Sequence, residues 1–176
     1  MPQLSLDIAQ LLAGALLLVS FMLLYQDRLS GLINIYALHA FILSLSVAWQ
    51  AYTQEAPHLF VTAAIALFFK ALIIPFSLKR IIKQLRVHRT VEIIGGVRIT
   101  MLFGIFLTAL SLVVMLPATT DVSALDREDL AFALAVILLG LLMMVTRRNA
   151  VSQIVGFMSL ENGLILAAAG ANGMPL

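Results

Sequence analysis

Six long apolar runs, separated by short polar stretches, dominate this chain of 176 residues. They cover residues 8–25, 32–52, 59–78, 99–116, 130–146 and 150–170. A helix needs about 20 mainly apolar residues to cross the hydrocarbon core of a membrane, and each run is of nearly that length. Because lipid cannot satisfy exposed backbone groups, a run of this kind must form a helix. The sequence therefore predicts an all-α polytopic membrane protein, a bundle of six transmembrane helices forming a single domain over residues 1–176.

Basic residues are distributed unevenly between the two ends of such a bundle. Of eleven lysines and arginines, only Arg127 falls on one side, Lys70 lies inside the third run, and nine fall on the other side. The nine are Arg28, Lys79, Arg80, Lys83, Arg86, Arg89, Arg98, Arg147 and Arg148. Short loops rich in such residues stay in the cytoplasm, so both termini are predicted outside. The basic cytoplasmic segment 79–98, which extends the third helix as far as Gly95-Gly96, can contact anionic lipid or a cytoplasmic partner.

Several classes of function find no support in the sequence. The chain has no cysteine, which excludes thiolate-held iron–sulfur clusters, cysteine-bound nickel and disulfides within it. No nucleophile–base pair, glycine-rich phosphate loop or metal-ligand cluster is recognisable. We therefore expect no free-standing enzyme, no metal site, no cofactor in this chain and no nucleic-acid partner.

Two charged residues interrupt the apolar runs, Lys70 in the third and Glu161 in the sixth. An ionisable residue at bilayer depth costs roughly 2.5–3.5 kcal/mol on insertion scales and marks a functional site by default. Pro75 lacks an N–H and so frees a carbonyl near Lys70, which favours a hydrated, charge-handling site over a lysine that snorkels to the interface. Glu161 is interpreted as a proton carrier or as a permanent partner of Lys70.

Polar side chains also follow one face of the second run. Tyr36, His39, Leu43, Ser46 and Gln50 are spaced three or four residues apart and so share a helical face. This face is either a segment of a proton path, in which His39 changes its charge, or an interhelical seam held by hydrogen bonds.

The sixth run has demands on both of its faces. Ser152, Gly156, Ser159 and Gly163 form a small-residue stripe that permits close helix packing. Gln153, Phe157, Glu161 and Ala168 lie nearly opposite, so we expect both faces to be buried. Asn149 is predicted to cap the start of this helix.

Two separated motifs carry a resemblance to a known family. The stretch Phe69–Pro75, together with Arg148-Asn149, Gly156-Phe157 and Glu161-Asn162-Gly163, resembles hydrogenase-4 component E, a membrane subunit of hydrogenase and formate hydrogenlyase complexes. Residues 130–170 are also similar to subunit K of respiratory complex I and to the small C-type subunit of Mrp-type cation/proton antiporters. Aligned on the Arg-Arg-Asn turn, the subunit K glutamate falls at Met158, one turn before Glu161. Component E continues beyond the segment matching residues 173–176 into a further helix, so we expect a shortened version or part of a longer protein.

The resemblance implies a non-catalytic membrane-arm subunit of a complex I-like energy-converting hydrogenase or related respiratory complex, in the inner (plasma) membrane of a prokaryote. It implies iron–sulfur and nickel–iron centres in peripheral redox subunits, with antiporter-like and quinone-site-type membrane subunits as further partners. The expected proton relay consists of Glu161, Lys70 and His39, and its supporting residues are Pro75, Asn162, Tyr36 and Gln153. The transported ion is H⁺ or Na⁺. The alternatives are a structural adaptor subunit and a subunit of a Mrp-type antiporter that has no redox partner.

Overall fold

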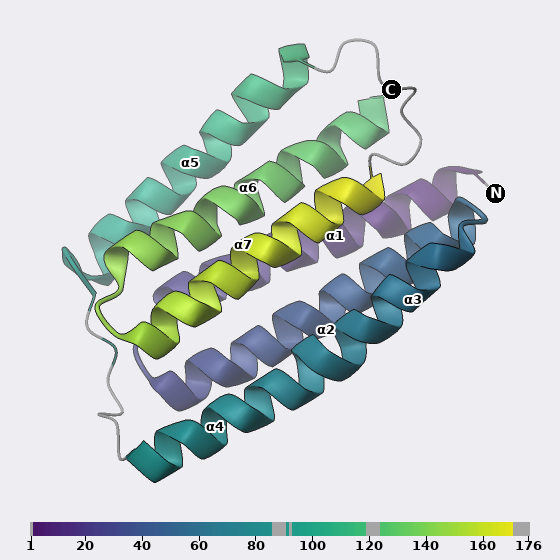
Figure 1. Cartoon of the computed structure of the whole chain (residues 1–176). Helices are drawn as coiled ribbons and strands as arrows, with labels where there is room; N and C mark the ends of the chain where they lie inside the picture. The colour runs from purple at the N-terminus through teal and green to yellow at the C-terminus, as the bar shows by residue number, and fades with distance from the viewer. Residues whose placement is uncertain (1, 86–90, 92, 119–123, 171–176) are drawn as a thin grey trace.

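The computed structural model describes residues 2–85, 91, 93–118 and 124–170. All the long elements in these ranges are helices (Figure 1). In chain order the elements are α1 (Pro2–Tyr25), α2 (Leu29–Thr53), α3 (Pro57–Ile65), the π-helix η1 (Ala66–Ile73), α4 (Ile74–Leu85), α5 (Gly96–Ala118), α6 (Ala124–Thr146) and α7 (Ala150–Gly170). The segments α3, η1 and α4 follow one another without a break and form one rod. Within the described ranges, the prediction of six helices long and apolar enough to cross a membrane is confirmed.

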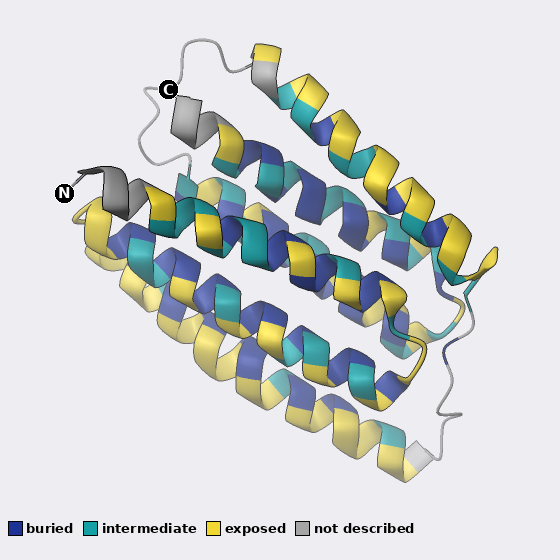
Figure 2. Cartoon of the chain, turned by 180° about the vertical axis from the view of Figure 1, so that it is seen from behind, coloured by how far each residue is buried: buried dark blue, intermediate teal, exposed yellow. Residues whose placement is uncertain are grey.

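The helices run up and down in one bundle (Figure 1). Its centre consists of α1, α2, α6 and α7, in which α6 packs along α7 and α1, and α2 packs against α1 and α7. The rod α3–η1–α4 lies against α2 at one edge, and α5 lies against α6 at the opposite edge. These two edge elements show much exposed surface in Figure 2. The start of α1 and the end of α7 lie at the same end of the bundle.

Glycines bring α6 and α7 into close contact. A Cβ atom on Gly140 would lie 2.6 Å from the backbone nitrogen of Leu160, and one on Gly163 would lie 2.9 Å from that of Ile137. Gly156 approaches the carbonyl oxygen of Gly140 in the same way, at 3.1 Å from the Cβ position. The small-residue stripe of the sixth run is therefore occupied by α6 of the same chain.

The rod formed by α3, η1 and α4 is longer than the helix predicted over residues 59–78. It runs from Pro57 to Leu85, so the first part of the basic segment continues the helix. The remainder of that segment includes residues 86–90 and 92, which lie outside the described residues. The helix α4 ends at Leu85 and does not extend to Gly95-Gly96 as predicted, since Val91, Ile93 and Ile94 are not helical. Both glycines have positive φ angles, 77° and 81°, which an L-residue rarely adopts, and α5 begins at Gly96.

The middle of this rod is a π-helix, which the sequence pattern did not predict. Its last bond joins the N–H of Ile74 to the carbonyl oxygen of Phe69, five residues earlier. The next residue, Pro75, has no N–H to continue the series, and the chain returns to α-helical geometry in α4. Segments of this kind are often found at functional sites, and here the π-helix contains Lys70.

Candidate functional site

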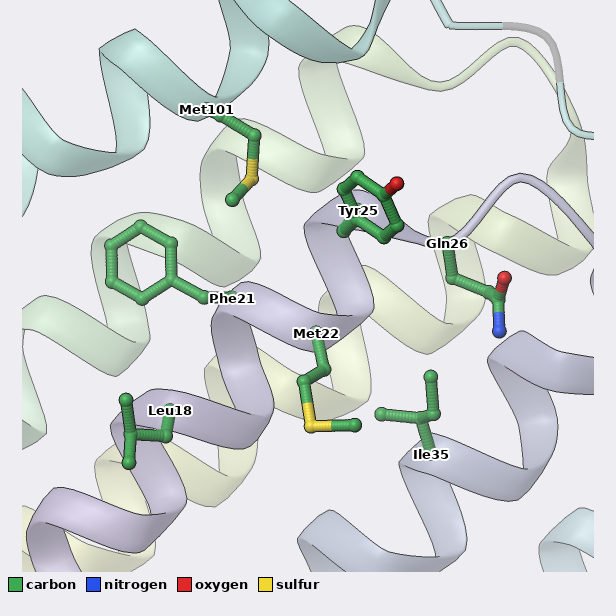
Figure 3. A pocket seen from close by; sticks show the side chains of 7 residues that line it. All are labelled: Leu18, Phe21, Met22, Tyr25, Gln26, Ile35 and Met101. Carbon is green, nitrogen blue, oxygen red and sulfur yellow. The ribbon is translucent and has the colours of Figure 1, made fainter.

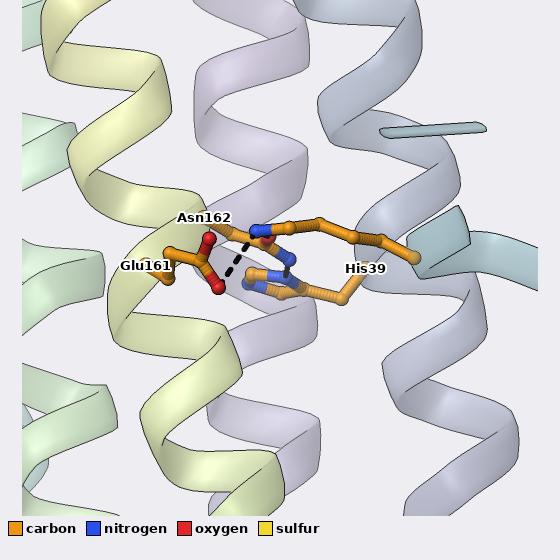
Figure 4. Close-up of polar contacts among 4 residues, drawn as sticks. His39, Glu161 and Asn162 are labelled. Atoms are coloured by element: carbon orange, nitrogen blue, oxygen red, sulfur yellow. Dashed lines mark hydrogen bonds and ion pairs between the residues drawn. The ribbon is translucent and has the colours of Figure 1, made fainter. Parts of the chain in front are cut away.

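Lys70 extends from η1 into the bundle, where it reaches two side chains of α7. Its Nζ atom lies 2.9 Å from Oδ1 of Asn162 and 3.1 Å from Oε2 of Glu161 (Figure 4). Only 8% of the residue is exposed. The lysine therefore does not snorkel toward a helix end but forms an ion pair that joins the edge rod to α7.

Asn162 also contacts His39 of α2, and His39 in turn contacts Ser20 of α1. Nδ2 of Asn162 lies 3.0 Å from Nδ1 of His39, and Nε2 of His39 lies 2.9 Å from Oγ of Ser20. Ser20 donates its one hydroxyl proton to the carbonyl of Leu16 at 3.0 Å, so it must accept a hydrogen bond from His39. The network thus assigns His39 as the neutral tautomer with its proton on Nε2 and an acceptor at Nδ1.

These bonds form one directed series through the bundle. Lys70 donates to Asn162, Asn162 donates to His39, and His39 donates to Ser20. The four residues come from four different elements and are all buried, and a buried polar group is tolerated when it is hydrogen-bonded. The amide of Asn162 does not ionise near neutral pH. Direct proton transfer between two ionisable groups in contact is therefore possible only between Lys70 and Glu161. The part of the series beyond Asn162 instead fixes the orientation of its amide.

Glu161 differs from its partners because it is open to one side. The side chain of Glu161 is 45% exposed, against 11% for that of Lys70. Its neighbours Phe157 and Leu164 are also exposed, by 52% and 51%. The prediction that both faces of the sixth run are buried is thus wrong within this chain, where the sides of α7 that pack on α6 and α2 are covered and the side with Phe157 and Leu164 is exposed. The carboxylate can be reached from outside the chain while it remains paired inside it.

The supporting residues occupy different places. Tyr36 is fully buried, and its hydroxyl has no hydrogen-bond partner among the described residues. Pro75 is buried just after the π-helix. Gln153 is not at the pair, because its Nε2 donates to the carbonyl of Arg147 at 2.8 Å in the turn between α6 and α7.

The turn before α7 contains a buried charge that the sequence pattern did not single out. Arg147 is only 1% exposed, and its Nη2 donates to the carbonyls of Leu23 at 3.2 Å and Leu24 at 2.6 Å, at the end of α1. Burial lowers the pKa of Arg147 to about 10, while Asp27 acts in the opposite direction, so the guanidinium stays charged at neutral pH. The predicted basic end of the bundle is thus corrected at this residue, which stabilises a helix C-terminus instead of facing the surroundings.

The same turn contains the predicted helix cap. The side-chain oxygen of Asn149 accepts a hydrogen bond from the N–H of Val151 at 2.8 Å, so the prediction of an N-cap is confirmed. This cap fixes where α7 begins and therefore how far along the helix Glu161 lies.

Away from the polar cluster, which consists of Ser20, His39, Lys70, Glu161 and Asn162, the bundle has a mainly apolar hollow. This hollow of about 650 Å³ lies between α1, α2 and α5, and the side chains that line it include Phe21, Met22 and Met101 (Figure 3). It shares no residue with the polar cluster. Within the described part of the chain, no group of three His, Cys, Asp or Glu side chains is placed to hold a metal ion.

Over the residues that the structure describes, the fold and the site define a helical protein with six helices of membrane-crossing length and a charged pair between two of them. The chain is 24% identical over 157 residues to the uncharacterized protein Rv0085 of Mycobacterium tuberculosis, and the alignment spans 89% of this chain and 71% of that protein. No protein-family model matches the chain. No solved structure matches it significantly.

Proposed function

We propose that the chain is a membrane-arm subunit of a complex I-like energy-converting hydrogenase or a related respiratory complex, in which it contributes to proton translocation coupled to redox chemistry in partner subunits. One observation carries this proposal: Lys70 and Glu161 lie near the middle of long apolar helices and form an ion pair. In a membrane, a pair at this depth is costly and is kept where charge movement is needed. The resemblance of residues 69–75 and 161–163 to component E supports the choice of complex.

In the proposed mechanism the proton moves along the 3.1 Å contact between Glu161 and Lys70. Glu161 exchanges protons with its open side, and a proton taken up there neutralises the carboxylate. Once Glu161 has released this proton again, its carboxylate can take the proton of the Lys70 ammonium along the same contact, which leaves a carboxylic acid at the open side and a neutral amine that stays bonded to Asn162. His39 acts as a positioning residue, since it orients the amide that holds Lys70.

A substitution of Glu161 tests this function. Glu161→Gln keeps the size of the side chain and removes its charge, so the complex should assemble while proton translocation per redox turnover falls by about tenfold or more, as expected for loss of a proton-transfer group. The matched control is Glu128→Gln, which changes an exposed carboxylate of α6 bonded to Gln10. The measurement is proton uptake and substrate turnover in vesicles that contain the purified complex.

The outcomes separate the alternatives. Unchanged coupling in an assembled Glu161→Gln complex would contradict the proposal. Lower yield with unchanged turnover per complex would indicate a structural adaptor. The small-residue stripe of α7 is not available for docking another subunit, because α6 already packs on it. Sodium-dependent proton exchange by a preparation without redox subunits would indicate a Mrp-type antiporter.

A further inference from the structure

A surface groove between α3 and α7 approaches the open side of the ion pair. It has a volume of about 290 Å³. Its lining comes from three residues of α3, His58, Leu59 and Thr62, and three residues of α7, Ile165, Ala168 and Ala169. One water molecule takes up about 30 Å³ in the liquid, so the groove has room for several.

The helical register leads from this groove to the pair. On α7, Ile165 lies four residues after Glu161, so it stands one turn away on the same face. On the edge rod, Thr62 follows His58 by four residues, and the same spacing continues through Ala66 to Lys70. Both walls therefore run from the end of the bundle where α3 begins toward the two charged side chains.

Two of the six lining residues, His58 and Thr62, offer polar groups to water, and the other four are apolar. His58 is exposed at the outer end, and the hydroxyl of Thr62 is partly exposed along the wall. The hydroxyl contacts only the carbonyl of His58, at the long distance of 3.4 Å, among the described residues, and its lone pairs remain available. On the opposite wall, Ala168 and Ala169 have small side chains that leave room in the groove. Gln54 fixes the end of α7 by donating a hydrogen bond to the carbonyl of Ala169 at 3.0 Å.

We propose that this groove is a hydrated access path through which protons reach Glu161 from the end of the bundle near His58. The role of this proton transfer rests on the proposed function, whereas the presence of water in the groove does not. The half-open carboxylate of Glu161, one helical turn beyond Ile165, supplies the group that would exchange protons with that water. The larger hollow in Figure 3 supports no such path, because none of its lining residues lies on the edge rod or on α7, the two elements that hold the pair.

Single cysteines test the path directly, because the chain has no cysteine of its own. Thr62→Cys and Ile165→Cys place a thiol in the groove. Their matched controls are Val61→Cys and Leu164→Cys, which are adjacent in sequence and almost equal in depth but expose their side chains outside the groove. The complex is treated with a charged, membrane-impermeant methanethiosulfonate in sealed vesicles of each orientation. Ala168→Cys provides a further groove position with a small change in volume.

The groove cysteines should react from one side of the membrane only, at least about tenfold faster than their neighbours. The reagent attacks the thiolate, and each unit by which apolar surroundings raise a thiol pKa lowers the thiolate fraction about tenfold. Equal rates within the pairs would overturn the proposal, because uniformly fast labelling would place these positions outside the membrane and uniformly slow labelling would mean that lipid fills the groove. Fast groove labelling with normal coupling in Glu161→Gln would keep the path and reject the relay. Slow groove labelling with impaired coupling in Glu161→Gln would reject the path and keep the relay.

Discussion

Replacing Lys70 by methionine tests what the polar cluster contributes to the stability of the fold. Methionine keeps the length of the side chain and its preference for helical geometry but has no ammonium group. Two hydrogen bonds with a charged donor are lost, at 2.9 Å to Asn162 and 3.1 Å to Glu161. Asn162 keeps its bond to His39, while the half-open carboxylate can recover part of the loss by taking up a proton.

The expected loss follows from the number and kind of these bonds. Interhelical hydrogen bonds in membrane proteins contribute about 0.6 kcal/mol on average, and bonds to an ionised group are about twice as strong. Two such bonds give about 2.4 kcal/mol. Because Glu161 is 45% exposed, its share is reduced, and we expect the free energy of unfolding to fall by about 2 kcal/mol, about a 30-fold change in the folding equilibrium.

Reversible unfolding of the purified chain in mixed micelles with increasing dodecyl sulfate, followed by circular dichroism, measures this loss. The control is Lys83→Met, because Lys83 is exposed on α4 and its removal should change stability by less than about 0.5 kcal/mol. The double variant Lys70→Met/Glu161→Gln should show a coupling of about 1 kcal/mol between the two sites. A loss in Lys70→Met no larger than in the control would refute the assignment of a stabilising ion pair.

Two further substitutions probe the packing of the central helices. Gly140→Ala should destabilise the fold by about 1–3 kcal/mol through overpacking, since the added carbon would lie 2.6 Å from the backbone of Leu160, whereas Gly14→Ala, which meets nothing within 4 Å, should be neutral or stabilising; a thermal unfolding series compares them, and equal effects would contradict the close contact of α6 and α7. Arg147→Met should cost about 1.5–3 kcal/mol and speed amide exchange in the last turn of α1, where Leu23 and Leu24 lose their donor. Exchange there as slow as in Arg80→Met, a change of an exposed residue, would argue against that capping role.

The positions of the six helices could be predicted because an apolar run of membrane length has few alternatives to a helix. Lys70 and Glu161 were also recognisable, since a charge in such a run is conspicuous. That they meet could not be predicted, because periodicity shows which face a residue occupies and not which helix packs on it. The same limit hid Ser20, a lone hydroxyl with no polar neighbour along its face, which contacts His39.

Other features depend on contacts that local composition does not reveal. Arg147 and Arg148 are adjacent and chemically alike, yet the first is buried at the end of α1 and the second is exposed. Gln153 shares a helical face with Glu161 in projection, but its amide turns back to the carbonyl of Arg147. The π-helix at Lys70 follows from backbone bonding within the folded rod, and Pro75 alone indicates only that the regular pattern is interrupted.

The direction of the hydrogen bonds limits how much positive charge this part of the molecule can hold. If His39 gained a second proton, its Nδ1 would become a donor facing the NH₂ group of Asn162, and the amide would have to turn over to present its oxygen. The NH₂ group would then face the ammonium of Lys70, donor against donor, and Lys70 would have to withdraw or become neutral. The network therefore accommodates one cation at a time, and the two bases are mutually exclusive alternatives for holding it.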